Sequence, residues 1–212
     1  MRTLLNAHPQ VAVPPESRFI TELWSGTREV DTAHFLSSLG AHKRFAVWEL
    51  PLEAVAAELP AGERIDYAAA IEAAYRAYAR AHDKRMWGDK TPRYVENIDF
   101  LAGLFPHSRF VHIVRDGRNV ALSYSSVPFG PQTVAKTASL WARRVGAGVR
   151  SGRALQPGRY LEVRYEDLVE DPADETKALC DFLDLEWDAG MLETERAREF
   201  VLDRAARYNP RV

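Results

Sequence analysis

The chain has 212 residues, 46% of them hydrophobic and 27% charged, which is ordinary for a globular domain and enough to bury one sizeable core. Its net charge of −2 excludes a global basic field for nucleic acid or anionic lipid, and it lacks the run of about 18 apolar residues that would predict a membrane span. The single cysteine, Cys180, excludes an internal disulfide, and we expect one cytoplasmic domain over residues 1–212 with Cys180 in its core.

Short strands and helices alternate along the first part of the chain. The strongest element is 67–82, where apolar residues recur at helical spacing. Residues 40–66 are irregular apart from a short helix near 52–58. In order, we expect a helix end at Arg2–Ala7, a strand at 11–13 stopped by two prolines, helices at 17–24, 32–39 and 67–82, a strand at 85–87 and a helix at 94–104.

The second part continues this alternation, which predicts an α/β fold with a parallel sheet flanked by helices. A long helix at 133–155 has an apolar side that includes Val134 and Trp141. Within it, the run from Gly146 to Gly152 misses the dinucleotide-loop spacing, so we interpret its small residues as a packing surface. The other expected elements are strands at Phe110–Val114 and 160–165, helices at 166–169 and 174–183, and a helical tail after Asp188.

The segment from Arg109 to Ser123 is the most informative about function. An apolar strand runs into a basic turn containing Arg115 and Gly117, and then into a helix. Ligands of open α/β sheets bind at the carboxyl ends of strands, where a following helix offers backbone N–H groups to an anion. Arg115 at the strand tip and Ser123 about two helical turns later are placed to grip one phosphate. Because Arg-Asp-Gly is also common turn chemistry, this segment alone predicts an anion site and a plain turn equally.

Three segments in this order carry a resemblance to a known family. They are Trp87-Gly-Asp-Lys90-Thr-Pro92, the run from Leu104 to Asn119, and the run from Leu161 to Leu168. Together they resemble the sulfotransferase superfamily, which uses 3′-phosphoadenosine 5′-phosphosulfate (PAPS), and most of all the bacterial relatives of the tyrosylprotein sulfotransferases. The resemblance implies a P-loop nucleotide-hydrolase-like fold and in-line transfer of a sulfuryl group to a hydroxyl acceptor.

The resemblance also implies roles for individual residues. Arg115 and Ser123 match the family residues that bind the 3′-phosphate of the donor, and Tyr165 matches a tyrosine that lines the donor site. Lys90 matches the lysine that contacts the sulfate and the leaving phosphate, a role that suits a mobile point charge with three donors. Without the other two segments, Lys90 would be interpreted as a solvated loop lysine, and Tyr165 as an aromatic residue ending a strand.

Glu16 matches the glutamate that acts as base in the tyrosylprotein branch. A carboxylate just after a strand stopped by two prolines is placed to accept the proton of an acceptor hydroxyl. A glutamate favoured by a helix N-terminus is an equal interpretation from the residues alone. Other branches use histidine, so His8 stays open as the alternative base, although a histidine before proline in a turn is more often structural.

The sequence departs from the family in places. The family's 5′-phosphosulfate loop, Pro-Arg-Ser-Gly-Thr-Thr, and the strand before it would precede Met1, so we expect the chain to lack both. A family arginine four residues after the phosphate-binding serine is Val127 here, and the closing C-terminal segment has no match. These departures favour, as the alternative, a truncated nucleotide-bisphosphate-binding relative without catalysis. A nucleoside kinase with a degenerate loop is a weaker interpretation, because no Mg²⁺ carboxylate can be assigned.

The remaining motifs predict little further chemistry. The six histidines show no metal-ligand spacing, so we expect no metal, and His112 alternates with apolar residues in a strand as a structural histidine. The partner we expect is a hydroxyl-bearing acceptor, whether a small molecule, a sugar or a peptide tyrosine, and not nucleic acid. The sequence does not indicate an oligomeric state.

Overall fold

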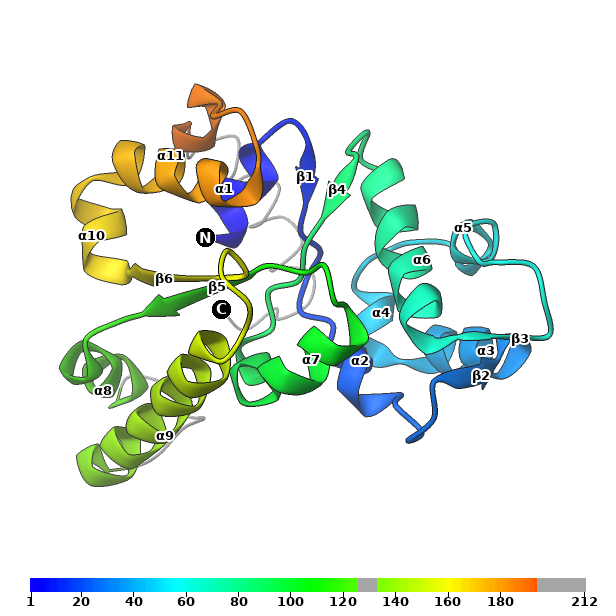
Figure 1. Cartoon of the computed structure of the whole chain (residues 1–212), viewed down its shortest axis with the longest axis horizontal. Coiled ribbons are helices and arrows are strands. Elements are labelled where there is room, and N and C mark those ends of the chain that lie inside the picture. The colour runs from blue at the N-terminus through cyan, green and yellow to red at the C-terminus, as the bar shows by residue number, and fades with distance from the viewer. Residues whose placement is uncertain (126–132, 194–212) are drawn as a thin grey trace. The chain divides into compact units, whose positions relative to one another are not determined.

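The computed structural model describes residues 1–125 and 133–193 (Figure 1). These residues group into two compact units, the first unit made of residues 1–91 and 188–193 and the second unit of residues 92–187. Each unit contains a pair of parallel strands with helices packed against it, which confirms the predicted α/β class. The expectation of a single domain over residues 1–212 stays a prediction.

The first unit is built around β1 and β4. Val11 pairs with Met86 and Ala12 with Trp87 in parallel register, and α6 packs beside both strands. Its elements are α1 (Arg2–Ala7), β1 (Val11–Ala12), α2 (Phe19–Glu22), β2 (Glu29–Asp31), α3 (Thr32–Ala41), α4 (Lys43–Ala46), α5 (Leu52–Ala56), β3 (Arg64–Asp66), α6 (Tyr67–Arg80), β4 (Met86–Trp87) and the 3-10 helix η2 (Ala189–Leu192).

The core of the first unit is α6 together with a cluster of aromatic rings. The Asp66 carboxylate caps α6 by accepting a hydrogen bond from the Ala69 amide at 3.1 Å, and alanine-rich turns then allow close packing around the helix. Tyr75 and Tyr78 on α6 lie against Trp48, with ring centroids 4.9 and 5.3 Å apart. The helical periodicity of 67–82 therefore correctly identified the main core element of this unit.

The antiparallel pair of β2 and β3 was not predicted from the sequence. Val30 pairs with Ile65, and the ion pairs Arg28–Asp66 and Arg64–Glu29 lie on its exposed edge at 3.2 and 3.3 Å. Strands of three residues are too short to show a reliable alternation of apolar and polar side chains. This two-stranded sheet thus depends on pairing between segments that are distant in the chain.

The second unit is built around β5 and β6, whose parallel register runs from Phe110 with Tyr160 to Val114 with Arg164. Its elements are the 3-10 helix η1 (Pro92–Asn97), α7 (Ile98–Leu104), β5 (Phe110–Val114), α8 (Gly117–Ser125), α9 (Val134–Arg153), β6 (Tyr160–Arg164), α10 (Tyr165–Glu170) and α11 (Pro172–Leu183). The helix expected at 94–104 begins as a 3-10 turn, and Cys180 on α11 is buried as predicted.

Helix α9 packs its small residues against the β5–β6 pair, as the sequence predicted. Gly148 faces His112, and Gly152 faces the ring of Tyr160. The Tyr160 hydroxyl and His112 Nδ1 are 2.7 Å apart, and burial lowers the pKa of His112, so this histidine is structural. Val134 was expected on the apolar side of this helix, but 73% of its surface is exposed because it lies in the first turn, beyond the strands.

Replacing Gly152 by Ala is expected to destabilise the protein by about 1–3 kcal/mol, because the new Cβ would overlap the Tyr160 ring. The ring has little freedom to move away, since its hydroxyl is hydrogen-bonded to His112. Urea denaturation measures the effect. The matched control is Gly103→Ala on α7, where nothing lies within 4 Å of the added methyl group, so a gain of about 0.5–1 kcal/mol is expected. Equal effects of the two substitutions would contradict the packing argument.

Candidate functional site

Glu16 and Lys90 form an ion pair in the first unit. Lys90 Nζ donates to Glu16 Oε1 at 2.9 Å, with 44% of the lysine side chain and 29% of the glutamate side chain exposed. Glu16 follows the carboxyl end of β1, and Lys90 follows the carboxyl end of β4, its parallel neighbour. Two residues predicted separately from distant segments therefore meet at one edge of the parallel pair, and both are accessible to a ligand.

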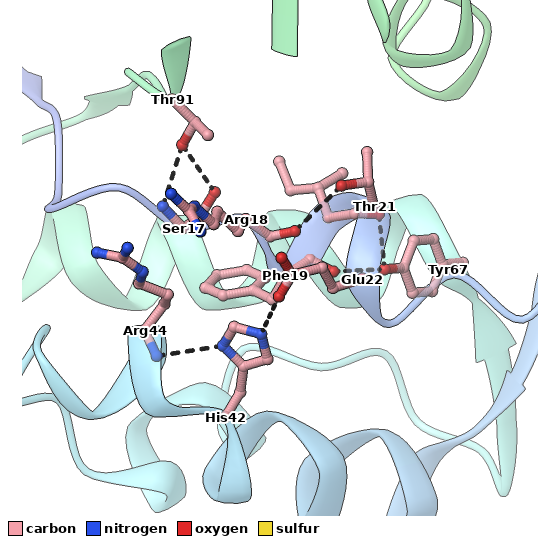
Figure 2. A network of polar contacts seen from close by, with 10 residues as sticks. Ser17, Arg18, Phe19, Thr21, Glu22, His42, Arg44, Tyr67 and Thr91 are labelled. Carbon is pink, nitrogen blue, oxygen red and sulfur yellow. Dashed lines mark hydrogen bonds and ion pairs between the residues drawn. The ribbon is translucent and has the colours of Figure 1, made fainter. Parts of the chain in front are cut away.

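The segment that carries Glu16 is held in place on both sides. The Trp48 Nε1–H donates to the Pro15 carbonyl at 2.9 Å. On the other side, the Ser17 amide donates to Thr91 Oγ1 at 3.1 Å (Figure 2). Arg18 then adopts a left-handed backbone conformation with φ of 56°, which turns the chain into α2. Because its neighbours on both sides are anchored in the buried core, the Glu16 backbone is fixed while its side chain reaches solvent.

Helix α2 is in turn fastened by polar contacts to the helices around it (Figure 2). The Tyr67 hydroxyl is within 3.2 Å of the Phe19 carbonyl and 3.0 Å of the Ile20 carbonyl, and Glu22 Oε2 lies 2.9 Å from His42 Nε2. Burial raises the pKa of Tyr67, which keeps the hydroxyl protonated as a donor. The sequence predicted a helix at 17–24, but the structure shortens it to Phe19–Glu22 because Ser17 and Arg18 make the turn.

A carboxylate that the sequence analysis did not single out lies beneath the ion pair. Asp89 Oδ2 accepts hydrogen bonds from Ser17 Oγ and from the Tyr75 hydroxyl, each at 2.6 Å. Burial raises the pKa of Asp89, and hydrogen bonds from the Ser17, Tyr75 and Thr91 side chains act in the opposite direction. Asp89 was visible within the motif at 87–92, but Ser17 is 72 residues away, so no local signal could have revealed the contact.

The two candidate bases, His8 and Glu16, differ in how far their side chains are exposed. His8 is only 1% exposed, its Nδ1 accepts a hydrogen bond from the Gln10 amide at 3.1 Å, and its carbonyl accepts one from Lys84 Nζ at 2.6 Å. A buried imidazole engaged with its own backbone turn is typical of a structural histidine. Of the two, only Glu16 presents its functional group at the surface.

In the second unit, Arg115 and Tyr165 lie side by side just beyond the carboxyl ends of β5 and β6. The guanidinium carbon of Arg115 is 4.6 Å from the centroid of the Tyr165 ring, and 38% of Tyr165 is exposed. The Trp141 Nε1–H donates to the Arg115 carbonyl at 2.9 Å, which fixes the backbone at the strand tip. Stacking on an aromatic face holds the planar guanidinium while leaving its edge available to an anion. Trp141 was noted only as an apolar residue, because its hydrogen-bonding role depends on tertiary contact.

The N-terminus of α8 differs from the expectation of free amides for an anion. Asp116 accepts a hydrogen bond from the Arg118 amide at 2.7 Å, and the Asp116 amide donates to Glu166 Oε1 at 3.0 Å. The Arg118 side chain and amide lower the pKa of Asp116 to about 2, and the Asp116 amide lowers the pKa of Glu166. Two of the protein's own carboxylates thus take up amides at the turn where the sequence predicted free amides.

Ser123 lies on the exposed surface of α8, two turns along the helix that follows the Arg115 turn, as predicted. Val127 and the tail after residue 193 lie outside the described residues. Over residues 1–125 and 133–193, there is no cluster of three or more histidine, cysteine or acidic side chains arranged to hold a metal. Within the same residues, none of the helices has the length and apolar character needed to cross a membrane.

Two curated proteins are similar to this chain over part of their length. The nodulation protein NoeE of Sinorhizobium fredii is 32% identical over 193 residues, which cover 81% of this chain and 43% of that protein. The protein-tyrosine sulfotransferase A of Caenorhabditis elegans is 26% identical over 121 residues, which cover 51% of this chain and 32% of that protein. The chain spans less than half the length of these curated relatives.

This chain also matches two solved structures and one family model. The sulfotransferase domains of the curacin biosynthetic pathway and of the Synechococcus PCC 7002 olefin synthase match with TM-scores of 0.62 and 0.63 at 21% and 24% identity. Each match covers 91% of this chain and 71% or 70% of the solved chain, which shows a shared fold. The model of the Sulfotransferase family matches residues 1–189. Because this match spans most of the sequence, the chain belongs to the Sulfotransferase family.

Proposed function

We propose that this chain transfers a sulfuryl group from PAPS to a hydroxyl acceptor by in-line displacement. The observation that carries the proposal is the Glu16–Lys90 pair, in which a carboxylate and an ammonium group meet at 2.9 Å beyond the ends of two parallel strands. Sulfuryl transfer requires a base for the attacking hydroxyl and a cation for the leaving phosphate. This accessible pair supplies both groups.

The chemistry of the step divides between the two residues. As the acceptor oxygen attacks sulfur, Glu16 takes up the hydroxyl proton, and the bond between sulfur and the bridging oxygen of the donor breaks. Lys90 stabilises the negative charge that builds on that bridging oxygen and on the leaving phosphate. The flexible lysine stem allows the ammonium group to exchange the Glu16 carboxylate for the donor.

Donor binding is assigned to Arg115, Ser123 and Tyr165 in the second unit. Arg115 Nε is buried and has no hydrogen-bond partner among the described residues, so the guanidinium retains capacity that a phosphate oxygen would use. The Trp141 contact and the stacked Tyr165 ring preorganise it. A bidentate contact between arginine and the 3′-phosphate would favour the bisphosphorylated nucleotide over nucleotides without that group.

The acceptor is proposed at the level of a hydroxyl-bearing molecule. One of the curated relatives is named a protein-tyrosine sulfotransferase, so a tyrosine peptide belongs among the first compounds to test. The direct experiment incubates the full chain with radiolabelled PAPS and a panel made of a phenol, a tyrosine peptide, a sugar and an aliphatic alcohol. Transfer of label to one acceptor class is expected.

The same preparation also distinguishes the proposed enzyme from a non-catalytic nucleotide-binding protein. A calorimetric titration with adenosine 3′,5′-bisphosphate, the nucleotide product, is run on the same preparation. Binding of this nucleotide without label transfer to any compound would overturn the proposal and favour a non-catalytic nucleotide-bisphosphate-binding protein. If the protein showed no nucleotide binding and no label transfer, both the sulfotransferase proposal and the non-catalytic alternative would be overturned.

A further inference from the structure

Asp89 connects the two chain segments that carry Glu16 and Lys90. It directly precedes Lys90, and its Oδ2 accepts a 2.6 Å hydrogen bond from Ser17, the residue that directly follows Glu16. Thr91, on the other side of Lys90, accepts a hydrogen bond from the Ser17 amide at 3.1 Å (Figure 2). Ser17 is therefore held by both neighbours of Lys90, and Glu16 faces Lys90 itself.

Buried and exposed side chains alternate along the two segments that carry Glu16 and Lys90, and this alternation explains why these two side chains meet at the surface. The Asp89 carboxylate and Thr91 are buried, whereas the Lys90 side chain between them is 44% exposed. In the other segment Ser17 is fully buried, and the adjacent Glu16 reaches the surface. Successive side chains of an extended chain point to opposite sides, so a buried contact between one pair of residues places the neighbouring pair together at the surface.

We propose that Asp89 is a positioning residue, which through its hydrogen bond to Ser17 sets the register of the Glu16 carboxylate against the Lys90 ammonium group. This inference rests on the proposed function, because it assigns the purpose of the register to sulfuryl transfer. The carboxylate is suited to the role because two short hydrogen bonds from buried hydroxyl groups fix its orientation. The accessible side chains of Glu16 and Lys90 would otherwise sample many geometries. Sulfuryl transfer would then be slower, because it requires the two groups to be aligned.

The chain offers a matched pair of substitutions for the test. Ser17→Ala and Tyr75→Phe each remove one hydroxyl that donates to Asp89 Oδ2 at 2.6 Å, but only Ser17 belongs to the Glu16 segment. We expect Ser17→Ala to lower kcat for sulfuryl transfer by about 10- to 100-fold with KM for the donor unchanged within twofold. Tyr75→Phe should keep kcat within about threefold of the wild type even where it costs stability, since the contact between the segments is retained. Equal losses of kcat in the two variants, or no loss in Ser17→Ala, would overturn the inference.

A second measurement tests the register without turnover. The coupling between Glu16 and Lys90 is obtained from a double-mutant cycle of Glu16→Gln and Lys90→Met, using urea denaturation. The cycle is repeated with Ser17→Ala and with Tyr75→Phe in the background. We expect at least half of the coupling to be lost in the first background and retained in the second. If Ser17→Ala loses the coupling but the wild type transfers no sulfuryl group, the proposed function alone is refuted. If the wild type transfers the sulfuryl group but Ser17→Ala leaves the coupling unchanged, the positioning role alone is refuted.

Discussion

Replacement of Glu16 by Gln is expected to lower kcat for the proposed sulfuryl transfer by about 10²–10⁴-fold, because the amide has almost no capacity to accept the acceptor's proton. Glutamine has nearly the shape of glutamate, so the fold and the contact with Lys90 are disturbed little. The affinity for adenosine 3′,5′-bisphosphate should stay within about twofold of wild type. Steady-state kinetics with the acceptor found in the panel, together with calorimetry, measure both quantities.

Glu29→Gln is the matched control for the loss of a carboxylate from an exposed ion pair. Glu29 lies in the same unit and pairs with Arg64 at 3.3 Å on the β2–β3 sheet, which is separate from the β1–β4 sheet. Its replacement should leave kcat within about twofold, since exposed ion pairs contribute little even to stability. If both variants kept full activity, Glu16 would not be the base.

Replacement of Arg115 by Ala is expected to weaken the binding of adenosine 3′,5′-bisphosphate by about 10- to 100-fold. Hydrogen bonds to charged groups contribute about 1.5–3 kcal/mol, and each 1.4 kcal/mol corresponds to about tenfold in affinity. The loss should be much smaller for adenosine 5′-phosphate, which lacks the group that Arg115 is proposed to hold. A calorimetric titration of the two nucleotides measures this difference.

Arg118→Ala controls for the loss of a positive charge at the same turn. The Arg118 side chain is 90% exposed and is bound to the Asp116 carboxylate at 2.6 Å, so its charge is already neutralised locally. We expect less than about threefold weakening for this variant. Equal effects of Arg115→Ala and Arg118→Ala would indicate a general charge effect and remove Arg115 from the donor site.

Much of the fold could be predicted from local patterns. The strand Phe110–Val114 and the helix at Tyr67–Arg80 were found within two residues at each end, because both have long apolar periodicities. The small residues between Gly146 and Gly152 were correctly interpreted as a packing surface. The antiparallel pair of β2 and β3 was missed because these three-residue strands are defined by their pairing partners rather than by their own sequence.

The candidate site shows the same division. The position of Arg115 and Ser123 after a predicted strand indicated an anion site, and the resemblance to the sulfotransferase superfamily was needed to single out Glu16, Lys90 and Tyr165. Their environment was not predictable. The free amides expected at α8 are taken up in part by the Asp116 and Glu166 carboxylates, and His8 is buried rather than open to an acceptor.

The sequence by itself determined the α/β class, the main elements and the chemical identity of the candidate residues, because these depend on periodicity and on short motifs within a few turns of chain. Only the tertiary structure decided that Lys90 pairs with Glu16, that Asp89 holds Ser17 beneath them, and that Trp141 and Tyr165 fix Arg115. Those contacts join residues between 26 and 74 positions apart, or lie across paired strands. They arise when burial of the core brings distant segments together, and no pattern within one segment records them.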